Sequence, residues 1–140
     1  MRLTTALLAD YANVSREGKL NVLGLFDSIY ASAFPAKHLQ MQLVMRFEVP
    51  VYDLGKESDL EIRLVDGDGK DILRIGGKFK VSGQKPAPGE PLHSDEILPL
   101  NNVIFPKPGK YQFVISINKH VEKEIFLTVN QISQPPLPNL

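Results

Sequence analysis

The sequence predicts an all-β fold, an antiparallel two-sheet β-sandwich of the immunoglobulin-like kind with about eight strands. Two observations carry this prediction. Apolar and polar residues alternate along several segments, and a period of two is typical of a strand with one buried face. Turn sequences rich in Gly, Asp and Pro separate these segments at roughly the 8–12-residue spacing of sandwich folds. With 140 residues, the chain has the size of one ordinary domain.

The first two segments are the least regular. Residues 2–11, "RLTTALLADY", fit either a strand or a helical stripe, and the Thr pair together with a suitable partner at residues 19–29 favours a strand. The partner segment, "KLNVLGLFDSIY", has apolar residues on both parities. Either both of its faces are covered, or Gly24 marks a bulge that changes the phase.

The later segments alternate more cleanly. They predict strands that line one core, whose expected members are Leu43, Met45, Phe47, Leu60, Ile62, Leu64, Phe113, Ile115, Ile125 and Leu127. The segment "HSDEILPLNNVIF" contains Pro99. Because proline cannot donate to a strand ladder, this segment is predicted to be an edge strand or a bent one.

Turn sequences define the remaining organisation. "DGDG" at residues 66–69 predicts a hairpin turn, and "SGQKPAPGEP" at residues 82–91 is the longest loop and the best candidate for mobility. We expect a single sandwich domain over residues 1–132 and a Pro-rich tail over residues 133–140. The "PPLP" of the tail could dock in an aromatic groove, although a frayed terminus is the favoured interpretation.

Composition narrows the function classes. Sixteen basic residues balance sixteen acidic ones, so no bulk charge attracts nucleic acid or an anionic membrane. The chain has no cysteine, which excludes disulfides and thiolate metal sites and suits a reducing compartment. No signal peptide or membrane-spanning stretch is recognised. We therefore expect a soluble, cytoplasmic protein without a cofactor or a metal site, and without a nucleic-acid or membrane partner.

The stretch "ADYANVSREGKLNVLG" concentrates polar residues between two apolar segments. Asn, Ser and Gly are residues that chain reversals use, so a turn explains part of the cluster. If the loop is a recognition surface, Arg16 and Glu17 should be exposed and Asn13 should bond the loop backbone. Since loops carry more than their share of binding residues, this loop is also the candidate binding site, with these members: Asp10, Asn13, Ser15, Arg16 and Glu17.

A catalytic set is not evident, and we expect that the protein is not an enzyme. The three histidines lie far apart in the sequence, and no common catalytic motif is present. The alternative is a hydrolase that uses His93 with Asp95 or Glu96, and with Ser94 or Ser82 as the nucleophile.

A binding function is the more favoured prediction. The expected partner is an unknown protein or a second copy of the chain, because the edges of a sandwich must be covered, blunted or used. A small-ligand or carbohydrate-binding module is the competing class. It would use exposed aromatic side chains, for which Tyr30 and Tyr52 are the candidates.

Two motifs point to a family. "LLADYANVSREGKLNVLGLFDSIYA" together with "LNNVIFPKPGKYQFVISIN" resembles the hallmark of a family of short bacterial proteins of unknown function. The resemblance extends from the first strand to about Val129. It implies a small β-sandwich, and it implies no activity, cofactor or catalytic residue.

Overall fold

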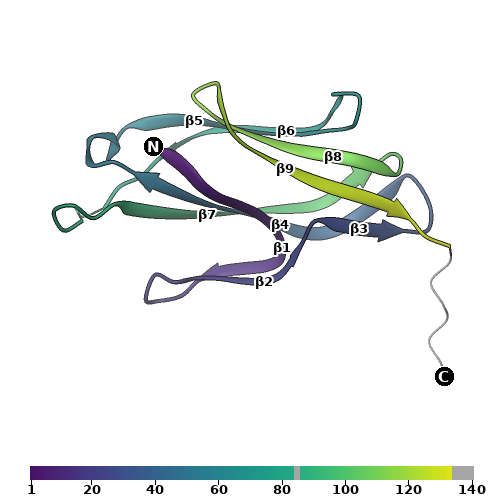
Figure 1. The fold of residues 1–140 in the computed structure, drawn as a ribbon, viewed down its shortest axis with the longest axis horizontal. Helices are drawn as coiled ribbons and strands as arrows, with labels where there is room; N and C mark the ends of the chain where they lie inside the picture. Colours follow the sequence, from purple (N-terminus) through teal and green to yellow (C-terminus); the bar gives the residue numbers. More distant parts are fainter. Residues whose placement is uncertain (84–85, 134–140) are drawn as a thin grey trace.

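The computed structural model describes residues 1–83 and 86–133, and nine strands in these residues form two stacked sheets (Figure 1). Sheet A has the order β2 (Leu20–Phe26), β1 (Arg2–Val14), β4 (Ala36–Val49) and β7 (Leu92–Phe105). Sheet B has the order β3 (Ser28–Ala31), β9 (His120–Gln131), β8 (Gly109–Ile117), β5 (Glu57–Val65) and β6 (Asp71–Lys80). A single 3₁₀ turn, η1 (Val51–Asp53), lies between β4 and β5 among the described elements. The predicted all-β two-sheet sandwich is confirmed.

The core between the sheets follows from the alternating patterns. Eight of the ten predicted core residues are buried, and Leu60 and Ile125 are half-buried against the same cluster. Leu39, which begins the alternating pattern of β4, is instead 69% exposed. Alternation therefore located the core face of most strands, but it did not show that the inward parity of β4 changes before Met41, since Ala36 and His38 are half-buried opposite the buried Phe105 and Val103.

A tyrosine at the start of β8 supports the corner between the sheets. The hydroxyl of Tyr111 donates a hydrogen bond of 2.5 Å to the carbonyl of Lys107, four residues upstream, and its ring packs edge-on against Phe105 with centroids 5.0 Å apart. Tyr111 is 1% exposed, so its hydroxyl needs this partner. The arrangement is the tyrosine corner of immunoglobulin-like sandwiches.

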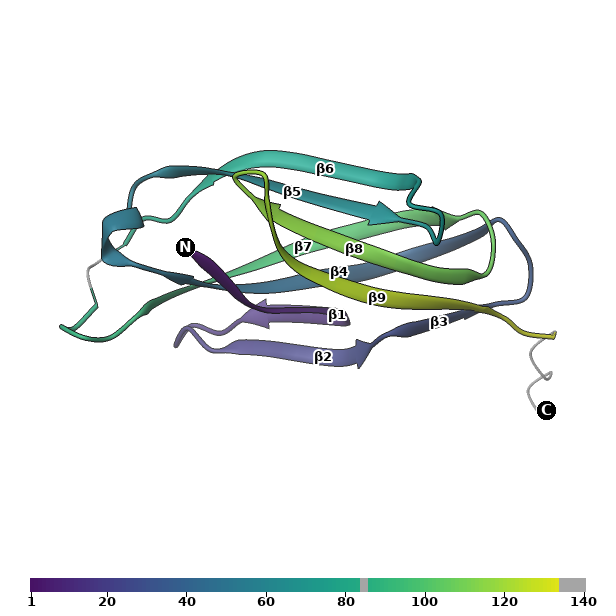
Figure 2. The same cartoon turned by 45° about the horizontal axis from the view of Figure 1, so that its top comes forward.

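The prediction of purely antiparallel sheets is wrong at one pair of strands. β3 runs parallel to β9, with Ser28 opposite Thr128 and Ala31 opposite Gln131. After β2 the chain leaves sheet A at Asp27, whose carbonyl accepts a 2.9 Å hydrogen bond from the amide of Thr128. β3 then continues beyond the end of β2 in sheet B, as Figure 2 shows. Side-chain alternation carries no information on the direction of a neighbouring strand, so the sequence pattern could not reveal this pairing.

Several local predictions are settled by the structure. Residues 2–11 are a strand, and "DGDG" turns the β5–β6 hairpin. β7, which contains Pro99, is an edge strand as predicted. The predicted mobile loop includes residues 84–85, and the tail with its "PPLP" motif begins at residue 133; residues 84–85 and 134–140 lie outside the described residues.

Replacement of Phe113 by Ala tests the core. Phe113 is fully buried, so Phe113→Ala is expected to lower the free energy of unfolding by about 3–5 kcal/mol, measured by denaturant titration. Phe126→Ala is the matched control because Phe126 lies on β9 and is 63% exposed. A loss at Phe113 of less than about 1 kcal/mol, as surface substitutions give, would contradict the assigned core.

Candidate functional site

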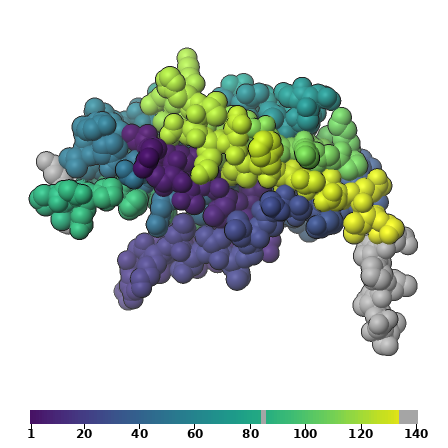
Figure 3. All heavy atoms as spheres, in the orientation of Figure 1, coloured from purple at the N-terminus to yellow at the C-terminus, as the bar shows by residue number. Residues whose placement is uncertain are grey.

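The β1–β2 hairpin extends beyond the sandwich. Pairing of β1 with β4 ends where Ala9 lies opposite Gln42, whereas pairing of β1 with β2 continues to Val14 opposite Leu20. We call the hairpin over residues 10–25 the arm. Figure 3 shows it standing out as a violet-blue lobe from the lower side of the molecule. Because β2 is the last strand of sheet A, its outer edge has no partner strand in the described chain.

Two side chains mark the point at which the arm leaves sheet A. The side-chain carbonyl of Gln42 accepts a 2.6 Å hydrogen bond from the amide of Ala12 and so takes the place of a strand partner. Gly24 has a φ of 72°, and a Cβ there would lie 2.5 Å from a carboxylate oxygen of Asp10. The close contact with Gly24 explains Asp10 structurally, as a side chain that covers the backbone of β2.

The tip of the arm is held by Ser15. Its hydroxyl oxygen accepts a 3.0 Å hydrogen bond from the amide of Lys19, and its own amide donates to the carbonyl of Lys19 at 2.8 Å. The expectation that Asn13 bonds the loop backbone is wrong. Asn13 lies opposite Asn21 in the strand pair. The side-chain oxygen of Asn13 accepts a 2.9 Å hydrogen bond from the side-chain amide of Asn21. The register of the hairpin, which the sequence left open, decides this partner.

The charged residues of the tip are exposed, as predicted for Arg16 and Glu17. Glu17 contacts Lys19 at 3.4 Å, and both side chains are about three-quarters exposed. A pair so exposed adds little to stability. The structure therefore divides the predicted cluster: Asp10, Asn13 and Ser15 make contacts within the arm, while Arg16 and Glu17 face the solvent.

The arm also carries apolar side chains that the described chain does not cover. Leu23 and Leu25 are 69% and 66% exposed and lie opposite Tyr11 and Ala9. The sequence alternatives for β2, coverage of both faces or a phase change at Gly24, did not include this outcome. The exposed large apolar residues of the arm are Tyr11, Val14, Val22, Leu23 and Leu25.

The edge strands of the sandwich differ in their protection. Edges that must stay unpaired are commonly short, or carry charges or proline. β7 carries Pro99 and acidic residues, β6 carries lysines, and β3 has only four residues. β2, "LNVLGLF", has no charged residue and no proline over its whole length. Of these described edges, β2 is the one open to the addition of another strand.

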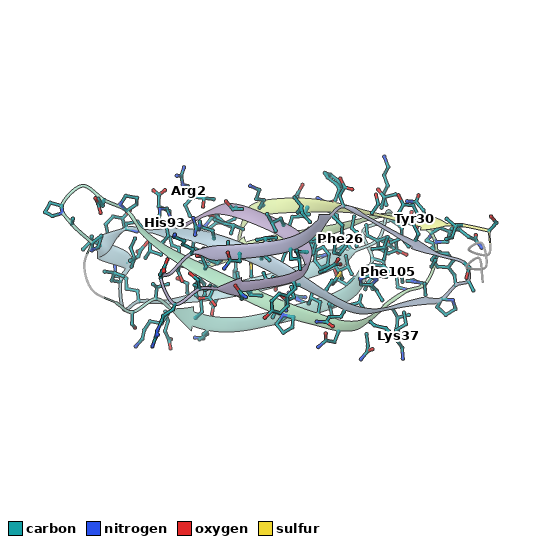
Figure 4. The ribbon with its side chains drawn as sticks, turned by 90° about the horizontal axis from the view of Figure 1, so that it is seen from below. Arg2, Phe26, Tyr30, Lys37, His93 and Phe105 are labelled. Carbon is teal, nitrogen blue, oxygen red and sulfur yellow. The ribbon has the colours of Figure 1, made fainter. Side chains whose placement is uncertain are left out.

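The structure does not bring Tyr30 and Tyr52 together. Tyr30 lies on β3, at the end of the molecule where β9 ends (Figures 1 and 4), and is 64% exposed. Tyr52 is 72% exposed in η1, whose Asp53 forms an ion pair with the amino terminus of Met1. The two rings therefore lie near opposite ends of the sandwich and do not form one aromatic platform.

Four of the predicted hydrolase residues, His93 to Glu96, lie on β7, whereas Ser82 lies in the loop after β6. Both carboxylate oxygens of Asp95 accept hydrogen bonds from Arg46, at 2.7 and 2.9 Å, and this interaction raises the pKa of Arg46. Ser94 donates to Glu96 at 3.3 Å. His93 is exposed near the start of β7 (Figure 4) and makes no side-chain hydrogen bond within the described part of the chain.

Hollows in the described part of the chain range from about 180 to 650 Å³. A cavity of about 180 Å³ lies between β6 and β7 and is lined by apolar residues together with Gly76, Gly77, Lys78 and Glu96. This volume is below the usual size of a ligand pocket. A groove of about 650 Å³ crosses the outer face of sheet B. Its Arg74 is bound to Glu61 at 2.7 Å, and its Arg63 is bound to Asp71 at 2.8 Å, so neither guanidinium is free to hold an anion.

The acidic turn after β5 has a structural role. One carboxylate oxygen of Asp66 accepts hydrogen bonds from the amides of Asp68 and Lys70, both at 2.9 Å. These bonds lower the pKa of Asp66, the one from Lys70 most strongly.

Across residues 1–83 and 86–133, no cluster of three or more His, Asp or Glu side chains is placed to hold a metal ion. No helix in the same residues has the length and apolar character needed to cross a membrane.

Replacement of Gly24 tests the contact with Asp10. Gly24→Ala is expected to lower the free energy of unfolding by about 1–2 kcal/mol from the left-handed backbone alone, with a further loss from the contact with Asp10. Combining it with Asp10→Ala should remove the second loss and keep the first. Gly77→Ala is the control, because Gly77 has no neighbour near its Cβ position. It should be neutral or stabilising by about 0.4–1 kcal/mol. Denaturant titration of the original chain and of the three variants measures these changes in the free energy of unfolding.

Removal of the tip charges tests their exposure. Arg16→Ala combined with Glu17→Ala should change the free energy of unfolding by less than about 1 kcal/mol, since exposed charges contribute little. If the tip contacts a partner, binding should fall in the same variant. A double variant that unfolds would show that these side chains support the arm.

The comparisons with known proteins address the family and the fold. A family model described as "Family of unknown function (DUF6941)" matches residues 4–130. Among solved structures, the chain is similar to an immunoglobulin-like protein from Pseudomonas aeruginosa, with 13% sequence identity, a TM-score of 0.46, and coverage of 92% of this chain and 95% of that chain. A search of curated proteins finds no match. Because the family model spans nearly the whole sequence, the chain belongs to this family of unknown function.

Proposed function

We propose that the protein is a non-catalytic protein-interaction module of the bacterial cytoplasm, and that the arm binds its partner by strand addition at the outer edge of β2. In this mode the main chains of two strands exchange hydrogen bonds, and alternate side chains supply specificity. The arm would contribute a free row of backbone groups on β2 together with the exposed Leu23 and Leu25.

The observation that carries this proposal is the composition of β2 at the edge of sheet A. Seven consecutive residues without a charge or a proline are an aggregation hazard at an exposed edge. The lysines of β6 and the proline of β7 blunt the other long edges. An apolar edge strand without charges or proline is best explained if a partner covers that edge.

The positions of the tyrosines disfavour a carbohydrate. A carbohydrate platform needs aromatic rings on one surface, whereas Tyr30 and Tyr52 lie near opposite ends of the sandwich. The engagement of Asp95 by Arg46 similarly disfavours a hydrolase built on His93.

A charge placed on the edge of β2 tests the proposal. Leu23→Lys should leave the free energy of unfolding within about 0.5 kcal/mol of the original, as exposed substitutions do. Partner affinity should fall about ten- to a hundredfold, because a contact worth about 1.5–3 kcal/mol is lost. Affinity capture from the native host measures how much partner protein each variant retains. A glycan array run in parallel measures carbohydrate binding.

Leu39→Lys is the matched control. Leu39 and Leu23 are both leucines with 69% exposure, and Leu39 lies on β4 outside the arm. The Leu39 variant should retain the partner. Equal capture by both variants, or binding to glycans that neither substitution affects, would contradict a function of the arm in protein binding.

A further inference from the structure

The edge strand of the arm is flanked by opposite charges. Lys19 directly precedes β2 and Asp27 directly follows it, with seven uncharged residues between them. Both flanking residues are exposed. A strand that is positive at its beginning and negative at its end is complementary to a second copy of itself in the antiparallel direction.

The geometry of antiparallel pairing restricts how two such strands can meet. Along one edge, the residues whose N–H and C=O groups point outward alternate with residues whose groups point inward. Outward residues of one copy must face outward residues of the other, so the position numbers of two facing residues are both odd or both even. A two-fold axis between identical strands therefore passes through a residue position. Lys19 and Asp27 satisfy this rule, and the residue midway between them is Leu23.

We propose that the arm's partner is a second copy of this chain, bound by antiparallel pairing of the two β2 edges about a two-fold axis at Leu23. This inference rests on the proposed function of the arm. Leu23 of each copy faces Leu23 of the other, and Lys19 of each copy faces Asp27 of the other. The two A sheets then form one continuous sheet, and an isologous interface of this kind closes without leaving a further edge for growth at β2.

The charged groups at the two ends of β2 are available to make these contacts. The ammonium group of Lys19 forms an ion pair with Glu17 at 3.4 Å, with both side chains largely exposed, so this pair is weak and easily exchanged. Asp27 accepts one side-chain hydrogen bond, from the hydroxyl of Ser28 at 3.3 Å. In the dimer each lysine gains a cross-strand carboxylate, an arrangement that stabilises antiparallel pairs.

Charge reversal distinguishes this pairing from a general apolar contact. The full chain, examined by sedimentation and light scattering over a range of concentrations, should be a dimer. Lys19→Glu alone and Asp27→Lys alone should each weaken the dimer about tenfold or more, because two attractive pairs become repulsive. The chain with both substitutions should dimerise again, since the pairs are restored with reversed sign. Lys80→Glu, at the end of the edge strand β6, is the matched control and should leave the dimer intact.

A cysteine at the axis tests the register. Because the natural chain has no cysteine, Leu23→Cys introduces a single thiol, which should form an intermolecular disulfide under mild oxidation. Residues directly opposite in antiparallel strands have Cβ atoms about 4.5–5.5 Å apart, close to the separation that a disulfide requires. Leu39→Cys, with the same exposure outside the arm, should remain largely monomeric on non-reducing gels.

The outcomes separate this inference from the proposed function. A full chain that is monomeric at all concentrations, or a dimer unaffected by the single charge reversals, overturns self-pairing through β2. If the Leu23→Lys variant nevertheless loses a host protein that Leu39→Lys retains, the interaction function of the arm stands with a different partner. If neither the oligomeric state nor capture responds to changes in β2, both proposals fail.

Discussion

The rest of the structure depends on the crossing of the chain from sheet A to sheet B at Asp27. The hydrogen bond from the Thr128 amide to the Asp27 carbonyl secures this crossing. Beyond it, β3 pairs in parallel with β9 and occupies the edge of sheet B. Before it, β2 remains in sheet A with β1 as its one neighbour in the described chain. The crossing thus covers the edge of β9 and at the same time leaves the edge of β2 open.

The arm is held together by its own contacts, although it leaves the sandwich. Gln42 satisfies an amide of β1 where the pairing of β1 with β4 ends, Asp10 packs over Gly24, and Ser15 closes the tip through two hydrogen bonds with Lys19. These contacts hold the hairpin without burying its leucines. An interaction surface with a preformed backbone loses less conformational entropy on binding than a flexible one, so the arm is suited to recognition by its main chain.

The polar cluster of the arm combines two roles. Asp10, Asn13 and Ser15 build the hairpin, and Arg16 and Glu17 are displayed at its tip. The residues with the most to contribute to binding are nevertheless the leucines of β2, which the sequence pattern had suggested were covered or out of phase. An exposed apolar side chain on an uncharged edge is more informative about interaction than a polar residue in a turn, because turns need polar residues for their own geometry.

The sequence by itself determined most of the strands, most of the core and several turns, since side-chain alternation, Asp-Gly turns and Pro99 act through local geometry. It also indicated that the polar cluster near residue 15 was a turn. It did not show that residues 19–29 divide into β2 and β3 in different sheets. Only the tertiary structure decided that β3 runs parallel to β9, that Asn13 meets Asn21, that Tyr30 and Tyr52 are far apart, and that β2 has an open edge. These features depend on which strands become neighbours. That choice is made by the packing of the whole chain, which no local period encodes.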